Sequence, residues 1–374
     1  MKNRTDIQKL CSRFTIPGDF VSAEPYGSGH INDTFRLTFA VGNMGDLDVI
    51  FDQAGCRIRY ILQRLNTEVF HDPAALMENI RRVTGHLAAK NGDSRSTLTL
   101  VPSLDGNVWI RDEEGSCWRV YLFIEHAKSF DVLETEQQAY EAANAFGKFQ
   151  ADLIDLPGRL IETIPDFHNT PKRIAALEEA VRADVCGRVR GAEREIEFVL
   201  SRKEEASTLI RLYQQGAIPE RITHNDTKLN NVLIDTESGK GICVIDLDTV
   251  MPGLVHYDFG DMVRTGTSPA AEDERDLSRV EMRFPMFEAL LRGYCAAAGA
   301  FLNPVEFEYL PFSGKLITLE IGTRFLTDYL SGDTYFKIHR DGHNFDRART
   351  QFALVRSIER QMDRMNALVR EIQK

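Results

Sequence analysis

The sequence predicts an α+β protein made of two lobes, a small antiparallel β-sheet lobe with one helix followed by a larger, mainly helical lobe. Short runs with the alternating pattern of β-strands dominate the first part of the chain. From about residue 134 the apolar residues recur with the period of amphipathic helices, and only one pair of short strands interrupts this pattern. We therefore expect an N-terminal domain over residues 1–125 and a C-terminal domain over residues 126–374.

Five short runs with turn signals between them predict the strands of the N-terminal lobe. Glycine-containing turns such as Asp105-Gly106 separate the runs. One helix interrupts them over residues 73–90, where Asp72 stands at the N-cap and Pro73 in the first turn. The five runs cover residues 35–39, 58–65, 97–101, 107–110 and 118–124.

The C-terminal lobe is predicted to contain long helices and one hairpin. Two strands at residues 231–234 and 241–245 bracket a polar turn, a spacing that indicates a hairpin. After residue 262 the pattern is helical to the end of the chain and includes a helix over residues 316–330. Before the hairpin, the predicted helices cover residues 134–153, 171–185 and 192–215.

The composition excludes several classes of function. The net charge of −11 argues against a protein whose main partner is a nucleic acid, because phosphate binding favours a basic surface. No apolar run approaches the ~18 residues of a membrane-spanning helix, and the first residues lack the apolar core of a signal peptide. The six cysteines are scattered, as expected of buried thiols in a reducing compartment. We expect a cytoplasmic protein without a membrane partner, present as a monomer or a weak homo-oligomer.

The hairpin brings three polar side chains to one edge of the helical lobe. The run HNDTKLNN at residues 224–231 leads into its first strand, and Asp246 follows its second. Phosphoryl transfer needs a carboxylate that accepts the proton of the attacking hydroxyl and oxygen ligands that hold Mg²⁺ against the phosphates. Asp226 is the candidate base, and Asn231 and Asp246 are the candidate metal ligands. Single residues of these types are typical of turns and caps, but the hairpin and the second acid favour a kinase that uses ATP and Mg²⁺.

This pattern resembles the aminoglycoside phosphotransferase and choline-kinase-like branch of the kinase fold, which is recognised by H-x-D-x-x-x-x-N and a later I-D-x-[DE]. The resemblance implies a two-lobed, protein-kinase-like fold. It also implies structural roles for His224 and Asp258, with the Asp258 carboxylate bonded to the main chain of the catalytic loop. Lys228 either steadies the transferring phosphate or is a solvated loop lysine. Asp248 either assists the metal or caps the next loop.

The nucleotide side carries weaker signals. Glycines in the run Gly27-Ser28-Gly29 let main-chain amides approach phosphates, although an ordinary hairpin turn has the same composition. The strand that should carry a cation for the phosphates contains no lysine. Either Gln63 or Arg64 occupies that position, and strand alternation allows only one of them to face the cleft.

Two further expectations on the nucleotide side depend on the order of the elements. Glu78 or Asn79 on the single helix is the candidate partner of the phosphate-binding residue. Adenine would lie against the end of the last strand and take hydrogen bonds from the main chain near Glu125 and Ala127. No side-chain signature supports this location.

Four segments of the chain also resemble the N-acetylhexosamine 1-kinases, at residues 29–34, 224–233, 245–253 and 319–333. By this resemblance the substrate would be N-acetylglucosamine or N-acetylgalactosamine, phosphorylated at the anomeric hydroxyl. It places His30, Asp226, Arg324 and Tyr335 at sugar-contacting positions. These side chains suit a sugar, because a carboxylate and a guanidinium bind hydroxyl groups and an aromatic ring covers an apolar sugar face.

Two other functions are consistent with these residues. A kinase of the same fold could act on an amine-bearing alcohol such as choline, homoserine or an aminoglycoside, and a cationic substrate would need acidic residues around its pocket. The run Glu272-Asp273-Glu274 offers such acids, although it is also typical of a solvated helix start. A non-catalytic nucleotide-binding protein of this fold is the other alternative, and the intact Asp226 and Asn231 argue against it.

Overall fold

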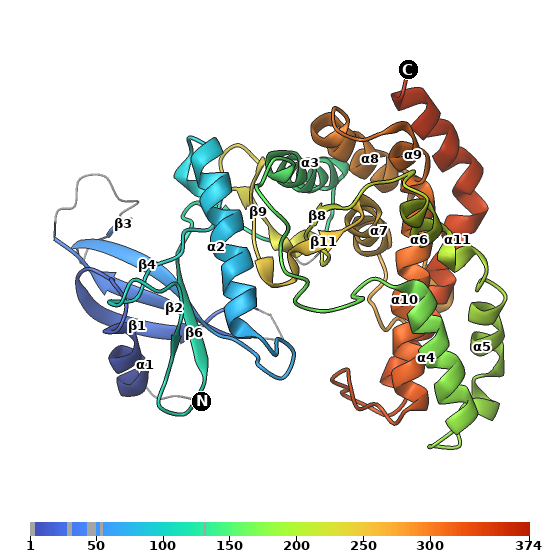
Figure 1. Cartoon of the computed structure of the whole chain (residues 1–374), viewed down its shortest axis with the longest axis horizontal. Helices are drawn as coiled ribbons and strands as arrows, with labels where there is room; N and C mark the ends of the chain where they lie inside the picture. Colours follow the sequence, from blue (N-terminus) through green and yellow to red (C-terminus); the bar gives the residue numbers. More distant parts are fainter. Residues whose placement is uncertain (1–3, 28–31, 43–49, 53–54, 131) are drawn as a thin grey trace.

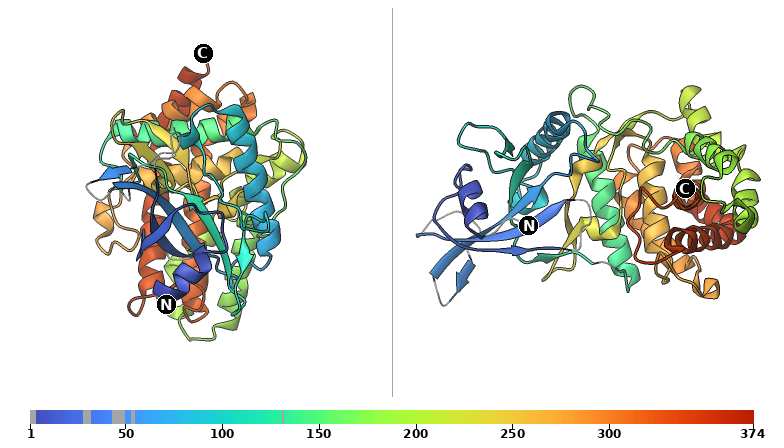
Figure 2. Two further views of the ribbon diagram at one scale, coloured as in Figure 1. Left: turned by 90° about the vertical axis from the view of Figure 1, so that its left-hand side faces the viewer. Right: turned by 90° about the horizontal axis from the view of Figure 1, so that it is seen from below.

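A computed structural model of the chain describes residues 4–27, 32–42, 50–52, 55–130 and 132–374. It consists of two lobes, and Figure 1 shows the sheet lobe on the left and the helical lobe on the right. The sheet lobe contains the first described helix of the chain, and the C-terminus lies in the helical lobe, as the second view in Figure 2 also shows. This is the α+β, two-lobed architecture that the sequence predicts.

An antiparallel sheet with the strand order β1-β2-β4-β6-β5 forms the first lobe, and β3 pairs with β4 beside this path. Alternation divides its side chains between two faces, because successive residues of a strand point in opposite directions. One face packs on helix α1, Arg4–Cys11, and the other faces α2, Pro73–Lys90, which lies toward the helical lobe in Figure 1. The strands are β1 Asp19–Pro25, β2 Asp33–Ala40, β3 Ile50–Asp52, β4 Gly55–Arg64, β5 Ile110–Arg111 and β6 Cys117–Leu122.

Three of the five predicted strands are confirmed as β2, β4 and β6, whereas α1 and β1 were not foreseen. The prediction for residues 107–110 reduces to the two-residue β5. The strand predicted at 97–101 is wrong, since only Leu100 forms an isolated bridge, to Tyr121. Pro102 follows this segment directly, and a proline has no amide hydrogen with which to continue a ladder.

Helix α2 begins and ends where the sequence predicts. The Asp72 carboxylate accepts hydrogen bonds from the amides of Ala74 and Ala75, at 3.1 and 3.0 Å. Pro73 occupies the first turn, where a missing amide hydrogen costs nothing. The cap and the proline therefore define the start of the helix.

The two lobes are connected between β6 and β7, Ala127–Lys128. Strand β7 pairs with β9, Val232–Asp235, which pairs in turn with β10, Gly241–Val244, in a three-stranded sheet. These last two strands are the predicted hairpin. The expected domain boundary at residues 125 and 126 falls within this connection. A second small sheet pairs β8, Arg221–Thr223, with β11, Met251–Gly253.

Helices make up the rest of the second lobe. The helix predicted over residues 192–215 is wrong as a single element, because residues 201–207 separate two shorter helices. Within this break Ser201 and Ser207 donate side-chain hydrogen bonds to the nearby carbonyls of Phe198 and Glu204, a local pattern that competes with helix formation. The helices are α3 Glu136–Leu153, α4 Thr170–Ala183, α5 Glu193–Leu200, α6 Thr208–Gln214, α7 Val255–Gly266, α8 Phe284–Ala298, α9 Pro304–Glu308, α10 Leu310–Leu330 and α11 His343–Ile372.

Helix α10 runs through the centre of the second lobe and is buried along most of its length. It packs against α11, α7 and α4, and its apolar side chains form one core with those of α4, α5 and α11, whereas the hairpin strands belong to a second core with α3, α7 and α8. None of the helices in the described part of the chain is long and apolar enough to span a lipid bilayer. All six cysteines are free thiols; Cys186 is exposed, contrary to the expectation that all are buried.

Candidate active site

The catalytic loop places Asp226 beside a lysine. The Nζ atom of Lys228 lies 3.2 Å from Oδ1 of Asp226, and the two side chains are 47% and 24% exposed. Burial alone would raise the pKa of Asp226, but the neighbouring cations, above all Lys228 and also Arg264, outweigh it and lower that pKa. The carboxylate is therefore ionised at neutral pH, which is the state required to accept a proton.

Asp258 on α7 holds the main chain of this loop. Its carboxylate accepts hydrogen bonds from the amides of His224 and Asn225, at 2.9 and 2.7 Å, and from the Gln150 side chain at 2.6 Å. This is the contact that the resemblance implies. Asn225 has a φ of 65°, in the left-handed region that asparagine tolerates better than most residues. Asp258 is thus committed to the loop backbone.

His224 is fully buried and joins the loop to the segment that carries Asp246. The Asp226 amide donates to His224 Nδ1 at 3.3 Å, and His224 Nε2 lies 2.9 Å from the Ile245 carbonyl. With Nδ1 accepting, Nε2 carries the proton and donates to Ile245. The edges of Phe146 and Phe149 pack on the imidazole. His224 therefore serves the architecture of the site.

Asn231 directly precedes the first strand of the hairpin and Asp246 follows the second, so both residues lie at the open end of the hairpin. Asn231 donates from its side chain to the Asp226 carbonyl at 2.9 Å, and its own carbonyl accepts from the Ile245 amide at 2.9 Å. Asp246 is left-handed, with φ 58° and ψ 57°. Burial and the carboxylates of Asp248 and Asp226 raise the pKa of Asp246 to about 6. A cation would offset this concentration of negative charge.

These donors fit a magnesium ion that is shared with a nucleotide. Mg²⁺ typically takes one or two protein carboxylates and completes its shell with water and substrate phosphates. Among the described residues, no group of three or more His, Cys, Asp or Glu side chains is arranged to hold a metal alone. The amide oxygen of Asn231 and the carboxylate of Asp246 suit such a partial shell.

The carboxylate of Asp248 contacts two residues outside its own loop. One carboxylate oxygen is paired with Nη1 of Arg119, and the other accepts a hydrogen bond from Asn32 at 2.6 Å. Both partners belong to the first lobe. Arg119 lies on β6 and is 1% exposed, and its Nε donates to Gln63 Oε1 at 2.9 Å. Asp248 therefore joins the lobes and does not cap its own loop.

The choice between Gln63 and Arg64 follows from this arrangement. Gln63 lies opposite Arg119 in the sheet and donates to Thr34 at 3.1 Å, so it is on the face turned to the second lobe. Arg64 points to the other face, where it pairs with Asp33. Arg64 is therefore not placed to bind phosphates in this structure.

Of the other residues predicted to bind the nucleotide, some lie outside the described residues and others have side chains that contact neighbouring residues. Gly27 has a φ of 79°, which favours glycine, whereas Ser28, Gly29 and His30 lie outside the described residues. The Glu125 side chain is buried against Arg59, with Nε to Oε1 at 2.8 Å, so only its main chain is available to a ligand. Ala127 belongs to β7 and lies opposite Asp235.

Neither candidate on α2 pairs with a phosphate-binding residue. Glu78 forms an ion pair with Arg81, one turn further along the same helix. Asn79 is buried and donates to the carbonyls of Ile161 and Val250, at 2.7 and 3.3 Å. The residue of α2 that contacts Arg119 is Met77, whose sulfur lies 3.9 Å from Nη1.

Arg324 and Tyr335 come together at the lower end of α10. The guanidinium of Arg324 lies 3.5 Å from the Tyr335 hydroxyl and within 6 Å of the rings of Phe167, Tyr335 and Phe336. Asp328 fixes the following loop by accepting hydrogen bonds from the amides of residues 334–336, each at 2.9 Å. Tyr335 itself remains 67% exposed.

A buried pair connects this group to the catalytic loop. His168 lies 2.8 Å from Glu320 of α10 through Nδ1 and 2.9 Å from the Asn225 carbonyl through Nε2. Burial alone would raise the pKa of Glu320, but His168, Thr170 and Arg324 outweigh it and lower that pKa. Arg324 is thus electrostatically linked to the loop that carries the candidate base.

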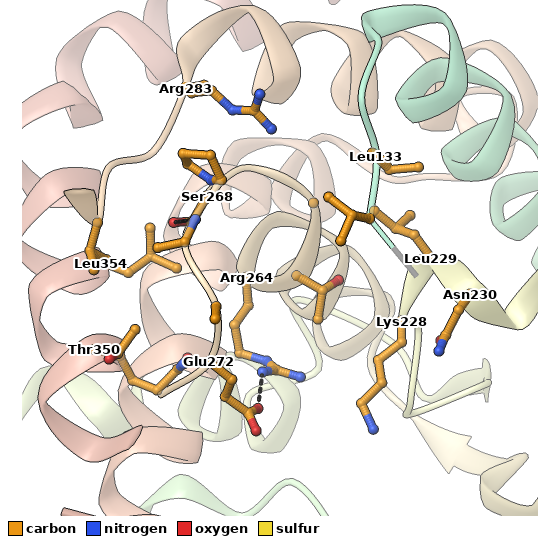
Figure 3. Close-up of a pocket in the computed structure, with 18 residues that line it drawn as sticks. Leu133, Lys228, Leu229, Asn230, Arg264, Ser268, Glu272, Arg283, Thr350 and Leu354 are labelled. Carbon is orange, nitrogen blue, oxygen red and sulfur yellow. Dashed lines mark hydrogen bonds and ion pairs between the residues drawn. The ribbon is translucent and has the colours of Figure 1, made fainter. Parts of the chain in front are cut away.

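A pocket of about 420 Å³ lies beside the catalytic loop. Figure 3 shows Lys228 and Arg264 extending in the same direction from two of its walls, with Arg264 bonded to Glu272. The Nε atom of Arg264 also pairs with Asp261 at 2.7 Å. Two cations of the lining, Lys228 and Arg264, therefore already pair with acidic residues.

Sequence reasoning missed four residues of this neighbourhood: Arg119, His168, Arg264 and Glu320. Arg119, Arg264 and Glu320 are charged side chains within a strand or helix, where such residues are rarely buried unless they are paired, whereas His168 lies in a turn before α4. A charge in such a position marks the residue but not its partner.

Comparisons with known proteins identify relatives in fold and in sequence family. The solved structures that resemble the chain include an aminoglycoside phosphotransferase from Alicyclobacillus acidocaldarius, with 13% identity, a TM-score of 0.60, and 98% of this chain and 96% of that chain covered. They also include an amicoumacin kinase in complex with AMP-PNP and Ca²⁺, with 13% identity, a TM-score of 0.59, and 94% and 93% covered. A choline kinase from Cryptosporidium parvum shows 13% identity, a TM-score of 0.54, and 98% of both chains covered.

At such low identity these structures show the fold alone. The family model described as the phosphotransferase enzyme family, APH, matches residues 22–301. This is more than half of the chain, and it includes the catalytic loop, the hairpin and Asp258. The chain therefore belongs to the phosphotransferase enzyme family.

Proposed function

We propose that this protein is an ATP-dependent kinase that phosphorylates the anomeric hydroxyl of N-acetylglucosamine or N-acetylgalactosamine. Family membership supports transfer to a small-molecule hydroxyl. The finer assignment draws on the resemblance of the four segments to N-acetylhexosamine 1-kinases. The observation that carries it is the group formed by Arg324, Tyr335 and Phe167, which combines a guanidinium with aromatic rings as a sugar site does.

In the proposed reaction Asp226 accepts the proton of the anomeric hydroxyl. The hydroxyl oxygen forms a bond to the γ-phosphorus of ATP, and the bond from that phosphorus to the bridging oxygen of ADP breaks. Lys228 keeps Asp226 ionised and presents a positive charge where the transferred phosphoryl group gains negative charge. Arg324 and Tyr335 would orient the sugar, and His30 would contact it as well.

Asn231 and Asp246 would hold Mg²⁺, which neutralises charge on the phosphates when bound. The main chain of Gly27, Ser28 and Gly29 would approach the phosphates. Gln63 would lie at the phosphates, and the main chain of Glu125 and Ala127 would receive adenine.

The charges around the site favour a sugar over an amine-bearing alcohol. The acids of the run 272–274 are each paired: Glu272 with Arg264, Asp273 with Arg340, and Glu274 with Arg279. This run forms a turn and not the expected helix start. The aromatic rings near α10, which would suit a quaternary ammonium, already face Arg324. A cationic substrate would meet cations there.

The test is a coupled assay of ADP release with Mg-ATP and a panel of acceptors. The panel contains both N-acetylhexosamines, glucose, galactose, choline, homoserine and kanamycin. We expect turnover with the N-acetylhexosamines, and phosphorus NMR of the product should show a phosphate coupled to the anomeric proton. The Asp226→Asn variant provides the background rate. Turnover with an amino alcohol only would overturn the sugar assignment and leave the family assignment intact.

A further inference from the structure

The phosphate side of the sheet lobe has its positive charge on an unexpected strand. Gln63 of β4 faces the second lobe and is neutral. Arg119 lies directly opposite it on β6, so the two side chains share that face. The hydrogen bond from Arg119 Nε to Gln63 Oε1, at 2.9 Å, fixes the guanidinium over the position where β4 lacks a cation.

Among the described residues, Arg119 is a buried charge with one acidic partner in hydrogen-bond contact, Asp248. Arg119 and Asp248 are 1% and 4% exposed, and a charge can be buried to this degree only when it is paired and hydrogen-bonded. The contact of Arg119 with α2 is the sulfur of Met77 and not an acid. The ion pair therefore runs from the sheet directly to the segment after the hairpin.

This segment needs support on both sides of Asp246. Asp246 is a non-glycine residue at φ 58°, a conformation that persists only where its surroundings hold it. On the upstream side, Ile245 is bonded through its amide to Asn231 and through its carbonyl to His224. On the downstream side, the side chain of Asp248 is held by Arg119 and Asn32. The second lobe thus provides one support and the first lobe the other.

We propose that Arg119 is a positioning residue of the metal–nucleotide site, which acts through Asp248 to hold Asp246 in its ligating conformation. The proposal rests on the phosphotransferase activity of the family and does not depend on which hydroxyl is phosphorylated.

The experiment measures binding of AMP-PNP by calorimetry, with Mg²⁺ and with EDTA, in the absence of any acceptor. The variants are Arg119→Met, Asp248→Asn, the double variant, and Arg119→Lys. Substitution of a residue that positions a metal ligand typically weakens metal affinity about 10- to 100-fold. We therefore expect the Kd measured with Mg²⁺ to rise at least about tenfold in both single variants and in the double variant. The Kd measured with EDTA should change less than about twofold, and Arg119→Lys should recover part of the loss.

The double variant separates positioning from stability. Each single variant leaves an unpaired buried charge and should lower the melting temperature, whereas the double variant removes both charges and should recover most of it. We expect its Mg²⁺-dependent binding to stay weak. If the double variant regains wild-type binding together with its melting temperature, the pair is only structural. An equal loss of affinity with EDTA would also overturn the proposal, because Arg119 would then contact the nucleotide itself.

A matched control is available in the same molecule. Arg95 and Asp235 form another ion pair between the lobes, at 2.8 Å, away from Asp246. The double variant Arg95→Met/Asp235→Asn removes the same two charges from the interface between the lobes. It should keep the wild-type Mg²⁺ dependence of AMP-PNP binding. A failed sugar assay would leave this test unaffected, since no acceptor is present.

Discussion

The catalytic loop and the phosphate side of the sheet are held in opposite ways. Residues 224–231 are held by nearby groups of their own lobe, above all by Asp258 of α7 and by the hairpin. The phosphate side depends on Gln63 and Arg119, whose charge is balanced by Asp248 of the other lobe. The candidate base is therefore held by contacts within one lobe, whereas the segment of the candidate metal ligand Asp246 also receives contacts from the other lobe.

This difference indicates a division between chemistry and nucleotide binding. Changes in the catalytic loop should act on the rate of transfer. Changes in the contacts of Gln63 and Arg119 should act on the affinity for Mg-ATP. Two substitutions test this division, and a third tests the pH dependence of stability.

The largest effect is expected from Asp226→Asn. A positioned general base typically contributes about 10²- to 10⁴-fold to the rate, and we expect kcat to fall by this amount. The substitution keeps the size of the side chain, and the anchors of the loop are main-chain contacts, so the affinity for Mg-AMP-PNP should change less than about twofold. Coupled ADP release and calorimetry measure the two quantities. Survival of kcat would show that Asp226 is not the base.

A smaller effect is expected from Gln63→Leu, and Arg64→Leu is its matched control. Loss of the Gln63 amide leaves the buried Nε of Arg119 without its acceptor, at a cost of about 1–3 kcal/mol. We expect the KM for ATP to rise about tenfold in Gln63→Leu, with kcat changed less. Arg64 pairs with Asp33 on the other face, so Arg64→Leu should leave both constants near their wild-type values. Equal effects in the two variants would contradict this assignment of the faces.

The smallest effect concerns the pH dependence of stability through His168. Burial alone would lower the pKa of His168, but Glu320 and the Asn225 carbonyl outweigh it and raise that pKa. The stabilisation is therefore fully present below the unfolded pKa of about 6.5 and is lost as the pH rises through the folded pKa. The free energy of unfolding of the wild type, measured with urea, should therefore fall between about pH 6 and pH 9. This fall should be smaller in His168→Gln.

His256 provides the control with the opposite sign. Burial lowers the pKa of His256 to about 4. As the pH falls, the unfolded state binds a proton on this histidine before the folded state does. The free energy of unfolding therefore falls between about pH 6.5 and pH 4, and this histidine does not affect it above that range. His256→Gln should therefore alter only the acid side of the profile. An identical response of the two variants would contradict the sign assigned to His168.

The parts of the molecule that the sequence predicts are those with local causes. Helix α2 has its cap and its proline side by side, and the catalytic loop, the hairpin and Asp258 lie within one continuous stretch. Arg119 and Asp248 are 129 positions apart, and His168 and Glu320 are 152 apart. Contacts between residues so far apart cannot be recognised from a single sequence, because no fixed spacing links the two partners. The strand predicted at 97–101 and the helix at 192–215 failed because a proline and two serines outweighed apolar patterns.

The three-stranded sheet gives the connection between the lobes a mechanical property. Strand β7 belongs to this connection and is also hydrogen-bonded to β9, which pairs with β10. A pivot at residues 123–126 would therefore lie beside the three-stranded sheet. The other two strands of this sheet lie close in the chain to Asn231 and Asp246. Points near an axis travel least when a body rotates. A swing of the sheet lobe would thus carry the outer strand β1 through a wide arc, while Arg119 of β6, which contacts Asp248, stays near the axis with the candidate metal ligands.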